Sequence, residues 1–304
     1  MSAWHAGIGL ALESRGLTYT EDAHYLIAHT DHATLAAAMR DAGLVADALV
    51  VDAPYSARVH DGHDNGAANA NAIADDEPVD NLTRYARGLP PIRRPLPYAA
   101  WGRDDVDGFC GAWSDVVRGW IGSMTDHLLA PEWATLLEMR GRYTFSPIAC
   151  VEPGSRVRLS GDGPAQWSTW LVVARPRTRE WQSWGALRGA YVVPPGGRGV
   201  QAGRRDSDSG RIPGGKPLWL MRAIVGDYSR PGDLVVDPCM GAGTTLVAAV
   251  ELGRRAIGCE PDAGRFEMAA KRLAKARPQM RMRLDVEAVD GEQSSWSMPR
   301  GGVE

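Results

Sequence analysis

Apolar runs that end on an acidic residue recur along the chain, and they predict the buried strands of a parallel sheet. Residues 25–31 (YLIAHTD) and 46–52 (ADALVVD) are two such runs. The segment 34–43 between them has helically spaced apolar residues and stops at Gly43. A strand, a helix and a strand within about 30 residues are typical of an α/β protein with a parallel sheet.

The same alternation returns after residue 217. We expect a helix over 218–225, a strand over 234–237, a Gly-rich turn, a helix over 244–252, a strand over 256–260 and a helix over 263–276. Between the two units, one apolar stripe predicts a helix over 104–120, followed by a strand over 120–126 and a helix over 131–140. The apolar segments 143–151 and 166–174 are expected to pair as antiparallel strands.

Two segments lose this periodicity. Residues 56–97 are rich in Asp, Asn, Gly, Ala and Pro, and residues 175–215 are rich in Gly, Pro and Arg. A loop of about 40 residues inside a compact domain is uncommon and is usually functional or disordered. We expect a mobile loop over 56–97 and a poorly ordered tail after Pro278.

Composition narrows the class of protein. The 304 residues correspond to about two domains or to one large α/β domain with an insertion. No apolar run approaches the roughly 18 residues of a spanning helix, and Met1 is not followed by a signal-like segment, so we expect a cytoplasmic protein. The four cysteines form no Cys-x-x-Cys pair and are expected to be reduced. A net charge of −3 offers no global argument for nucleic-acid binding, which must therefore be local.

The first chemical motif is the Gly-rich turn Asp237-Pro-Cys-Met-Gly241-Ala-Gly243-Thr-Thr245. Glycines there allow a ligand to approach the backbone, and the amides of the turn and of the following helix can donate to it. Glu260 ends the next predicted strand, where a carboxylate can bind ribose hydroxyls. The turn lacks the third glycine of a dinucleotide fingerprint and the Gly-Lys-Ser/Thr of a Walker A loop. An ordinary strand–helix turn is the alternative.

The second motif is Asp52-Ala53-Pro54-Tyr55, at the end of the second predicted strand. Ligands of open α/β sheets bind beyond the carboxyl ends of strands. There, Asp52 and a turn carbonyl can accept hydrogen bonds from an exocyclic amino group, and the Tyr55 ring can stack on a base. A simple Pro-Tyr turn is the alternative.

Together the two motifs resemble those of the S-adenosylmethionine-dependent DNA amino-methyltransferases, the N6-adenine and N4-cytosine family. The Gly-rich turn is similar to the cofactor loop of the family, Asp-Pro-Phe-x-Gly-x-Gly-Thr-Thr, and the tetrapeptide is similar to its Asp-Pro-Pro-Tyr. The tetrapeptide comes first in the chain, which is the permuted order of the family's beta group. Lys216-Pro217, His29-Thr-Asp31 and Trp167 to Ala174 also resemble family segments, so that the resemblance covers roughly residues 20 to 275.

This resemblance implies a circularly permuted, Rossmann-like methyltransferase sheet. It divides the chain into a catalytic half (1–175), a small irregular target-recognition segment (176–215), a cofactor half (216–277) and a flexible tail (278–304). The implied catalytic residues are Asp52, Ala53, Pro54 and Tyr55. The implied S-adenosylmethionine-binding residues are Asp31, Lys216, Pro217, Asp237, Pro238, Cys239, Gly241, Gly243, Thr244, Thr245 and Glu260. The sequence departs from the family at Ala53 and Cys239, which replace Pro and Phe but remove no group that the chemistry needs.

The implied substrate is a short DNA target, methylated at N6 of adenine. Arginines of two irregular segments are candidate DNA contacts, since Arg near aromatic residues suits phosphate and base binding: Arg58, Arg177, Arg179, Arg198, Arg204, Arg205 and Arg211. The His and Asp residues after Arg58 fit no zinc spacing, so no metal is expected. Methylation of cytosine N4 or of an RNA amine, and a non-enzymatic DNA-binding relative, stay open, although Asp at position 52 favours adenine. A homodimer and a cognate restriction enzyme are partners that the sequence does not decide.

Overall fold

A large sheet covered by helices on both faces organises the chain. The computed structural model describes residues 4–59, 98–153, 163–164, 166–178, 184–192 and 215–279. Its helices are α1 (Ala6–Glu13), α2 (His32–Asp41), α5 (Arg103–Trp113), α6 (Ala130–Met139), α8 (Leu218–Tyr228), α9 (Thr244–Glu251) and α10 (Ala263–Leu273). Its strands are β1 (Tyr19–Glu21), β2 (Tyr25–Ala28), β3 (Ala46–Asp52), β4 (Val117–Thr125), β5 (Arg142–Thr144), β6 (Ile148–Val151), β7 (Ser168–Pro176), β8 (Ala190–Val192), β9 (Leu234–Asp237) and β10 (Arg255–Cys259).

The strand order confirms the predicted fold class. The sheet runs β1-β2-β10-β9-β3-β4-β7-β6-β8, with β5 beside β7. Strands β2, β10, β9, β3 and β4 are mutually parallel, while β7 pairs antiparallel with β4. The last two strands of the chain therefore lie between β2 and β3, which is a Rossmann-like sheet in circularly permuted order. The permutation brings the two sequence motifs onto adjacent strands.

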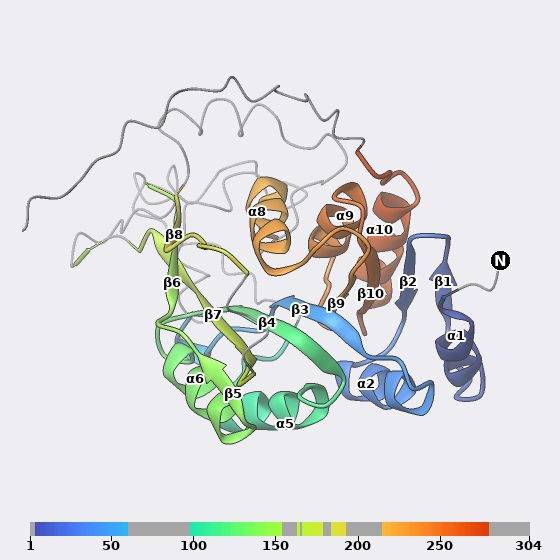
Figure 1. Ribbon diagram of the computed structural model, residues 1–304, viewed down its shortest axis with the longest axis horizontal. Helices are drawn as coiled ribbons and strands as arrows, with labels where there is room; N and C mark the ends of the chain where they lie inside the picture. Colours follow the sequence, from blue (N-terminus) through green and yellow to red (C-terminus); the bar gives the residue numbers. More distant parts are fainter. Residues whose placement is uncertain are drawn as a thin grey trace, which may run out of the picture.

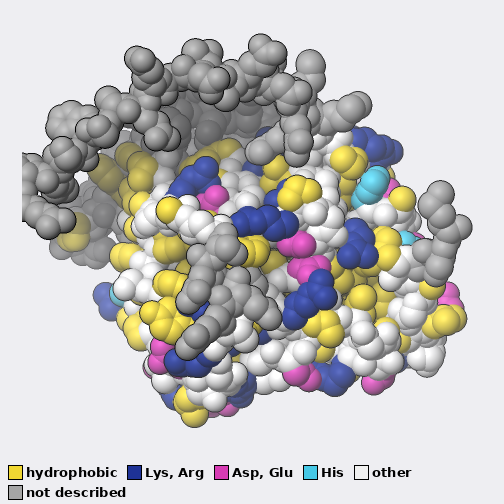
Figure 2. Space-filling model, in the orientation of Figure 1, with side chains coloured by type: hydrophobic (Ala, Val, Ile, Leu, Met, Phe, Trp, Pro, Cys, Tyr) yellow, Lys and Arg dark blue, Asp and Glu magenta, His cyan; other side chains and the backbone are white. Residues whose placement is uncertain are grey.

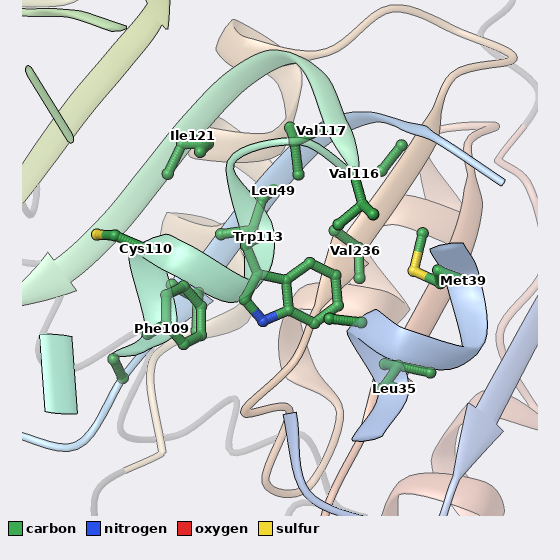
Figure 3. Close-up of a cluster of buried hydrophobic side chains, with 14 of the residues drawn as sticks. Leu35, Met39, Leu49, Phe109, Cys110, Trp113, Val116, Val117, Ile121 and Val236 are labelled. Atoms are coloured by element: carbon green, nitrogen blue, oxygen red, sulfur yellow. The ribbon is translucent and has the colours of Figure 1, made fainter. Parts of the chain in front are cut away.

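Two apolar cores, one on each face, hold the helices on the sheet. Helices α8, α9 and α10 cover one face, and α2, α5 and α6 cover the other (Figure 1). Trp113, completely buried, lies in the second core among side chains from α2, α5, β3, β4 and β9 (Figure 3). Burying one large aromatic side chain contributes about 1.5–3 kcal/mol. Both faces of β3 and β9 are thus buried in apolar layers.

Several predicted boundaries are wrong. The helix expected over 104–120 ends at Trp113, and Val117 and Trp120 belong to β4 instead. The error arises because both residues are buried, so the apolar pattern continues from the helix into the strand. The segment 143–151 contains two short strands, β5 and β6, which both pair antiparallel with β7. Helix α1 and strands β1 and β8 were not predicted.

No helix in the described part of the chain is both long and apolar enough to cross a membrane.

Candidate functional site

Three acidic residues converge at the carboxyl edge of the sheet. Asp52 ends β3, Asp237 ends the neighbouring strand β9, and Glu260 follows β10 directly. The registers Leu49↔Val236 and Gly258↔Asp237 align the three strand ends. Burial is the main cause that raises the pKa of Asp237, and the charges of Asp52 and Glu260 raise it further, as expected for groups close together. The predicted juxtaposition of the two motifs is therefore what the fold produces.

The Asp52 carboxylate is held by side chains from two distant parts of the chain. Lys216 Nζ donates to Asp52 Oδ2 at 2.8 Å, and the Tyr55 hydroxyl donates to Asp52 Oδ1 at 3.2 Å. Lys216 Nζ also lies 4.8 Å from the centroid of the Tyr55 ring. The Asp52 side chain keeps 23% of its surface exposed. Because a carboxylate has about four acceptor positions, Asp52 can still accept hydrogen bonds from a ligand.

The backbone after Asp52 is fixed at two points. The Trp101 amide donates to the Tyr55 carbonyl at 3.0 Å, and the Ser56 amide donates to Asp126 Oδ2 at 2.7 Å. Burial raises the pKa of Asp126, but the hydrogen bonds from Ser56 and from the following turn outweigh it and leave that pKa lowered. Ala53, where the family has Pro, is buried among the side chains of the α2–α5 face. Packing and hydrogen bonds thus supply rigidity to the turn.

Asp237 has a different environment. Its side chain is 1% exposed, and its carboxylate accepts hydrogen bonds from the Cys239 amide at 3.1 Å and from the Thr245 hydroxyl. Burial raises the pKa of Asp237 to about 7. Burial also raises the pKa of the Cys239 thiol well above its usual value. Asp237 therefore shapes the Gly-rich turn rather than facing solvent.

Glu260 closes the other side of the same turn. The Gly241 amide donates to Glu260 Oε2 at 3.0 Å, and the Asp262 amide donates to Oε1 at 3.1 Å. The residue is 6% exposed, and burial raises the pKa of its carboxyl group. Each carboxylate oxygen retains a further acceptor position, as binding of ribose hydroxyls requires.

The two glycines of the turn serve different purposes. Both have left-handed backbone conformations, with φ +52° at Gly241 and +77° at Gly243. A Cβ on Gly243 would lie 3.1 Å from Ala269 Cβ of α10, whereas a Cβ on Gly241 would meet nothing within 4 Å. The missing side chain of Gly243 therefore serves helix packing. Gly241 is the glycine that leaves an open backbone surface at the sheet edge.

Three other predicted cofactor residues, Asp31, Pro217 and Thr244, lie at the N-termini of helices α2, α8 and α9. Asp31 is the N-cap of α2 and accepts from the Thr34 amide at 2.9 Å and from the Thr34 hydroxyl at 2.8 Å. Burial raises the pKa of Asp31, yet these hydrogen bonds outweigh it and the net pKa is lowered. Thr244 accepts from Arg272 Nη1 at 3.0 Å, and Pro217 is the N-cap of α8. Lys216, also predicted to bind the cofactor, contacts Asp52.

Tyr98 is a site residue that sequence reasoning missed. Arg265 Cζ lies 4.8 Å from the centroid of its ring. Burial raises the pKa of Tyr98; the charges of Asp52 and Glu260 raise it further, while those of Lys216 and Arg265 lower it. Tyr98 therefore lies near both the Asp52–Tyr55 turn and Glu260 beside the Gly-rich turn. The sequence around Tyr98 gives only a weak indication of this position, namely an aromatic residue shortly before an amphipathic helix.

The predicted DNA contacts are only partly described. Arg58 is exposed just beyond the tetrapeptide. Arg177 follows β7, which runs antiparallel to β4, so it lies at the opposite edge of the sheet, about 20 Å from the level of Asp52. Five other arginines lie outside the described residues: Arg179, Arg198, Arg204, Arg205 and Arg211. Most of the predicted loop 56–97, most of the segment 176–215 and the tail after residue 279 lie outside them too.

The charges at the surface and the polar groups of the site indicate which class of ligand fits here. On the face shown in Figure 2, basic and acidic side chains alternate instead of forming one basic field. Among the described residues, no group of His, Cys, Asp and Glu side chains could hold a metal ion. The Gly-rich turn and Glu260 fit the nucleoside of S-adenosylmethionine, because an open backbone surface at Gly241 adjoins an acid with free acceptor positions.

Comparisons with known proteins agree with this chemistry. Residues 181–271 match the family model described as DNA methylase. Over 65 residues, the chain is 40% identical to the type II methyltransferase M2.DpnII of Streptococcus pneumoniae, a match that covers 21% of this chain and 24% of that protein. Over 58 residues, it is 43% identical to the type II methyltransferase M.HindIII of Haemophilus influenzae, covering 19% of each. The aligned part of the chain thus spans about a quarter or less of these relatives.

The fold comparison extends over most of the chain. The crystal structure of M1.HpyAVI in complex with SAM superposes with a TM-score of 0.57 and 20% identity, covering 82% of this chain and 98% of that one. A second structure of M1.HpyAVI gives a TM-score of 0.53 over the same share. At this identity the likeness concerns the fold. The sequence match to the DNA methylase family thus concerns residues 181–271, which include the Gly-rich turn and Glu260, and the fold likeness to M1.HpyAVI extends over most of the chain.

Proposed function

We propose that this protein is a DNA methyltransferase that transfers a methyl group from S-adenosylmethionine to N6 of adenine in a short target sequence. The observation that carries the proposal is the position of Asp52. Its partly exposed carboxylate lies at the carboxyl end of β3, directly beside the strand that leads into the Gly-rich turn. A hydrogen-bond acceptor for an amine and a nucleoside-binding turn are therefore neighbours.

Positioning and electrostatics account for most of the catalysis. An exocyclic amine is a poor nucleophile because its lone pair is delocalised into the ring. Hydrogen bonds accepted by Asp52 and by a carbonyl of the Ala53-Pro54 turn favour a tetrahedral nitrogen, which localises the lone pair. S-adenosylmethionine supplies an electrophilic methyl group on a sulfonium. The carboxylate must be ionised for this task, since a protonated oxygen would donate instead of accept.

The cofactor contacts follow from the acceptors and amides at the sheet edge. Glu260 would accept hydrogen bonds from the ribose hydroxyls, and the backbone at Gly241 would lie against the cofactor. Asp31, the N-cap of α2 shortly after strand β2, would border the adenine. Asp237, Thr244 and Thr245 hold the turn in shape, through hydrogen bonds within the protein.

The target base must leave the duplex to reach Asp52. Tyr55, three residues beyond Asp52, offers a π-face on which an extruded base can stack. Arg58 and the arginines of the 176–215 segment are the proposed phosphate contacts. Asp at position 52, where Ser is the other common choice for this chemistry, favours adenine over cytosine.

Sequencing of methylated bases tests the proposal directly. The gene and its Asp52→Ala variant are expressed in a host without DNA methyltransferases, and the DNA is examined for N6-methyladenine and N4-methylcytosine. N6-methyladenine in one short context, lost in the variant, supports the proposal. N4-methylcytosine would overturn the adenine assignment. Unmodified DNA with intact cofactor binding would favour an RNA methyltransferase or a non-enzymatic DNA-binding relative.

A further inference from the structure

The ammonium group of Lys216 has no role in the reaction described above, yet it contacts both parts of the catalytic motif. We propose that Lys216 is a positioning residue for Asp52: it fixes the orientation of the carboxylate through Oδ2, so that the other acceptor positions meet the target amine. The inference rests on the proposed function for its catalytic meaning. The contact itself stands on geometry.

The ion pair between Lys216 and Asp52 is shorter and more buried than a typical ion pair of a surface lysine. Lys216 Nζ lies 2.8 Å from Asp52 Oδ2, and the two side chains are 16% and 23% exposed. Lys216 directly precedes Pro217, the N-cap of α8, and Leu220 and Met221 of that helix are buried in the core. The packing of α8 therefore fixes the backbone from which the Lys216 side chain extends. Partial burial and a fixed origin strengthen a charge-assisted hydrogen bond relative to an exposed pair.

Asp52 needs a cation because its surroundings are acidic and apolar. The titratable groups that face it are Tyr55 on its own turn, Tyr98 before α5, Cys150 on β6, and Asp237 and Cys239 of the Gly-rich turn. Glu260 follows β10, one strand further from Asp52 than Asp237, and Arg265 lies against the Tyr98 ring. Asp237 and Glu260 are stabilised by amide and hydroxyl donors, whereas Asp52 has the charge of Lys216.

Lys216 also leaves the carboxylate free to act. It occupies one acceptor position on Oδ2, and the Tyr55 hydroxyl occupies one on Oδ1, so about two positions remain for an amine. Its contact with the Tyr55 ring, 4.8 Å from the centroid, links the carboxylate to the stacking surface. The Lys216 side chain thus positions both the Asp52 carboxylate and the Tyr55 ring on which a base can stack.

Three variants test the proposal. Lys216→Met keeps the length of the aliphatic chain and removes the charge, and Lys216→Arg restores the charge. Lys271→Met is the matched control, because Lys271 is exposed on α10 and its ion pair is a 3.8 Å contact with Glu267. All are made in the full chain, and circular dichroism with thermal unfolding verifies that they fold.

The first measurement does not require activity. The side-chain carboxyl carbon of Asp52, assigned with Asp52→Asn, is observed by NMR at neutral pH. In Lys216→Met its resonance should shift and broaden, because the carboxylate loses the charge-assisted hydrogen bond on Oδ2 that holds it in one orientation. Lys216→Arg should reverse most of the change, and Lys271→Met should cause none. An unchanged resonance in Lys216→Met would overturn the proposal.

The second measurement separates positioning from cofactor binding. In Lys216→Met, kcat should fall about tenfold or more at neutral pH, and Lys216→Arg should restore most of it. The KM for DNA and the calorimetric Kd for S-adenosylmethionine should change less than about threefold. A large loss of cofactor affinity with normal kcat would make Lys216 a cofactor ligand instead. If the wild type methylates no DNA, the proposed function fails, while the NMR measurement still decides whether Lys216 orients Asp52.

Discussion

The two neighbouring strands β3 and β9 both end on an aspartate, and the two aspartates have opposite environments. Asp237 is 1% exposed and accepts hydrogen bonds from its own turn, at Cys239 and Thr245. Asp52 is 23% exposed and is bound by Lys216 and Tyr55 side chains. The first carboxylate has its acceptor positions directed into the protein. The second still has positions directed outward.

This difference assigns the two residues to different tasks. A buried carboxylate that accepts amide hydrogen bonds holds a loop in one conformation, so its loss affects shape. A partly exposed carboxylate beside a cation can bind an external donor, so its loss affects chemistry. An acid at a strand end is therefore a candidate for either task, and the hydrogen bonds around it distinguish them.

The largest effect is expected at Asp52. Asp52→Ala should lower the rate of methyl transfer by about a thousandfold or more, because the acceptor acts mainly in the transition state. Affinity for S-adenosylmethionine should change little. Single-turnover transfer of a labelled methyl group and calorimetry measure the two quantities. Transfer at the wild-type rate would reduce the tetrapeptide to a strand-ending turn.

Asp237→Asn should change the free energy of unfolding by an amount that depends on pH. Folding raises the pKa of Asp237 from 3.8 to about 7, so the stability that it contributes is fully present below about pH 3.8 and is lost as pH rises through about 7. Asn does not titrate, so the free energy of unfolding of the variant relative to wild type should increase across this window. Urea unfolding at several pH values checks it, with the exposed Asp104→Asn as control. A pH-independent difference would contradict the assignment.

Removing the Glu260 side chain and removing the Tyr55 side chain should each weaken the binding of a different ligand. Glu260→Ala should weaken S-adenosylmethionine binding by about 1–3 kcal/mol, through lost charge-assisted hydrogen bonds, and leave DNA affinity nearly unchanged. Tyr55→Ala should weaken binding of DNA with an extruded base by about 1–3 kcal/mol and leave cofactor affinity nearly unchanged. Tyr55→Trp should keep partial activity, because the requirement is a flat π-face. Calorimetry with each ligand separates the two; equal losses for both ligands would mean that the sides are not independent.

The smallest effects should distinguish the two glycines. Gly243→Ala should lower the free energy of unfolding by about 1–3 kcal/mol, because its Cβ crowds Ala269 in a left-handed conformation. Gly241→Ala should cost about 1 kcal/mol of stability and also weaken cofactor binding. Gly232→Ala, which has φ +88° and open space before β9, is the control for the conformational cost alone. Normal cofactor affinity in Gly241→Ala would remove that glycine from the binding surface.

Much of this protein is determined by its sequence alone. Strands β3 and β9 have the predicted bounds, because short β-branched, apolar runs between turn signals have few alternatives. The strand-ending acids and the glycine spacing indicated the chemistry, since strand ends of a parallel sheet share one edge. The pattern failed where a helix passed directly into a buried strand, at Trp113 to Trp120, because both elements are apolar there.

Only the tertiary structure decided how each side chain is used. Lys216 is 164 residues from Asp52, and Tyr98 meets Arg265 across the site, so no local pattern could pair them. The split between Gly241 and Gly243 depends on where α10 packs, and the placement of Arg177 at the far edge depends on the direction of β7. Residue types and spacing specify local conformation and candidate chemistry. Which groups meet depends on the order in which the strands pair, and that order results from packing the whole sheet.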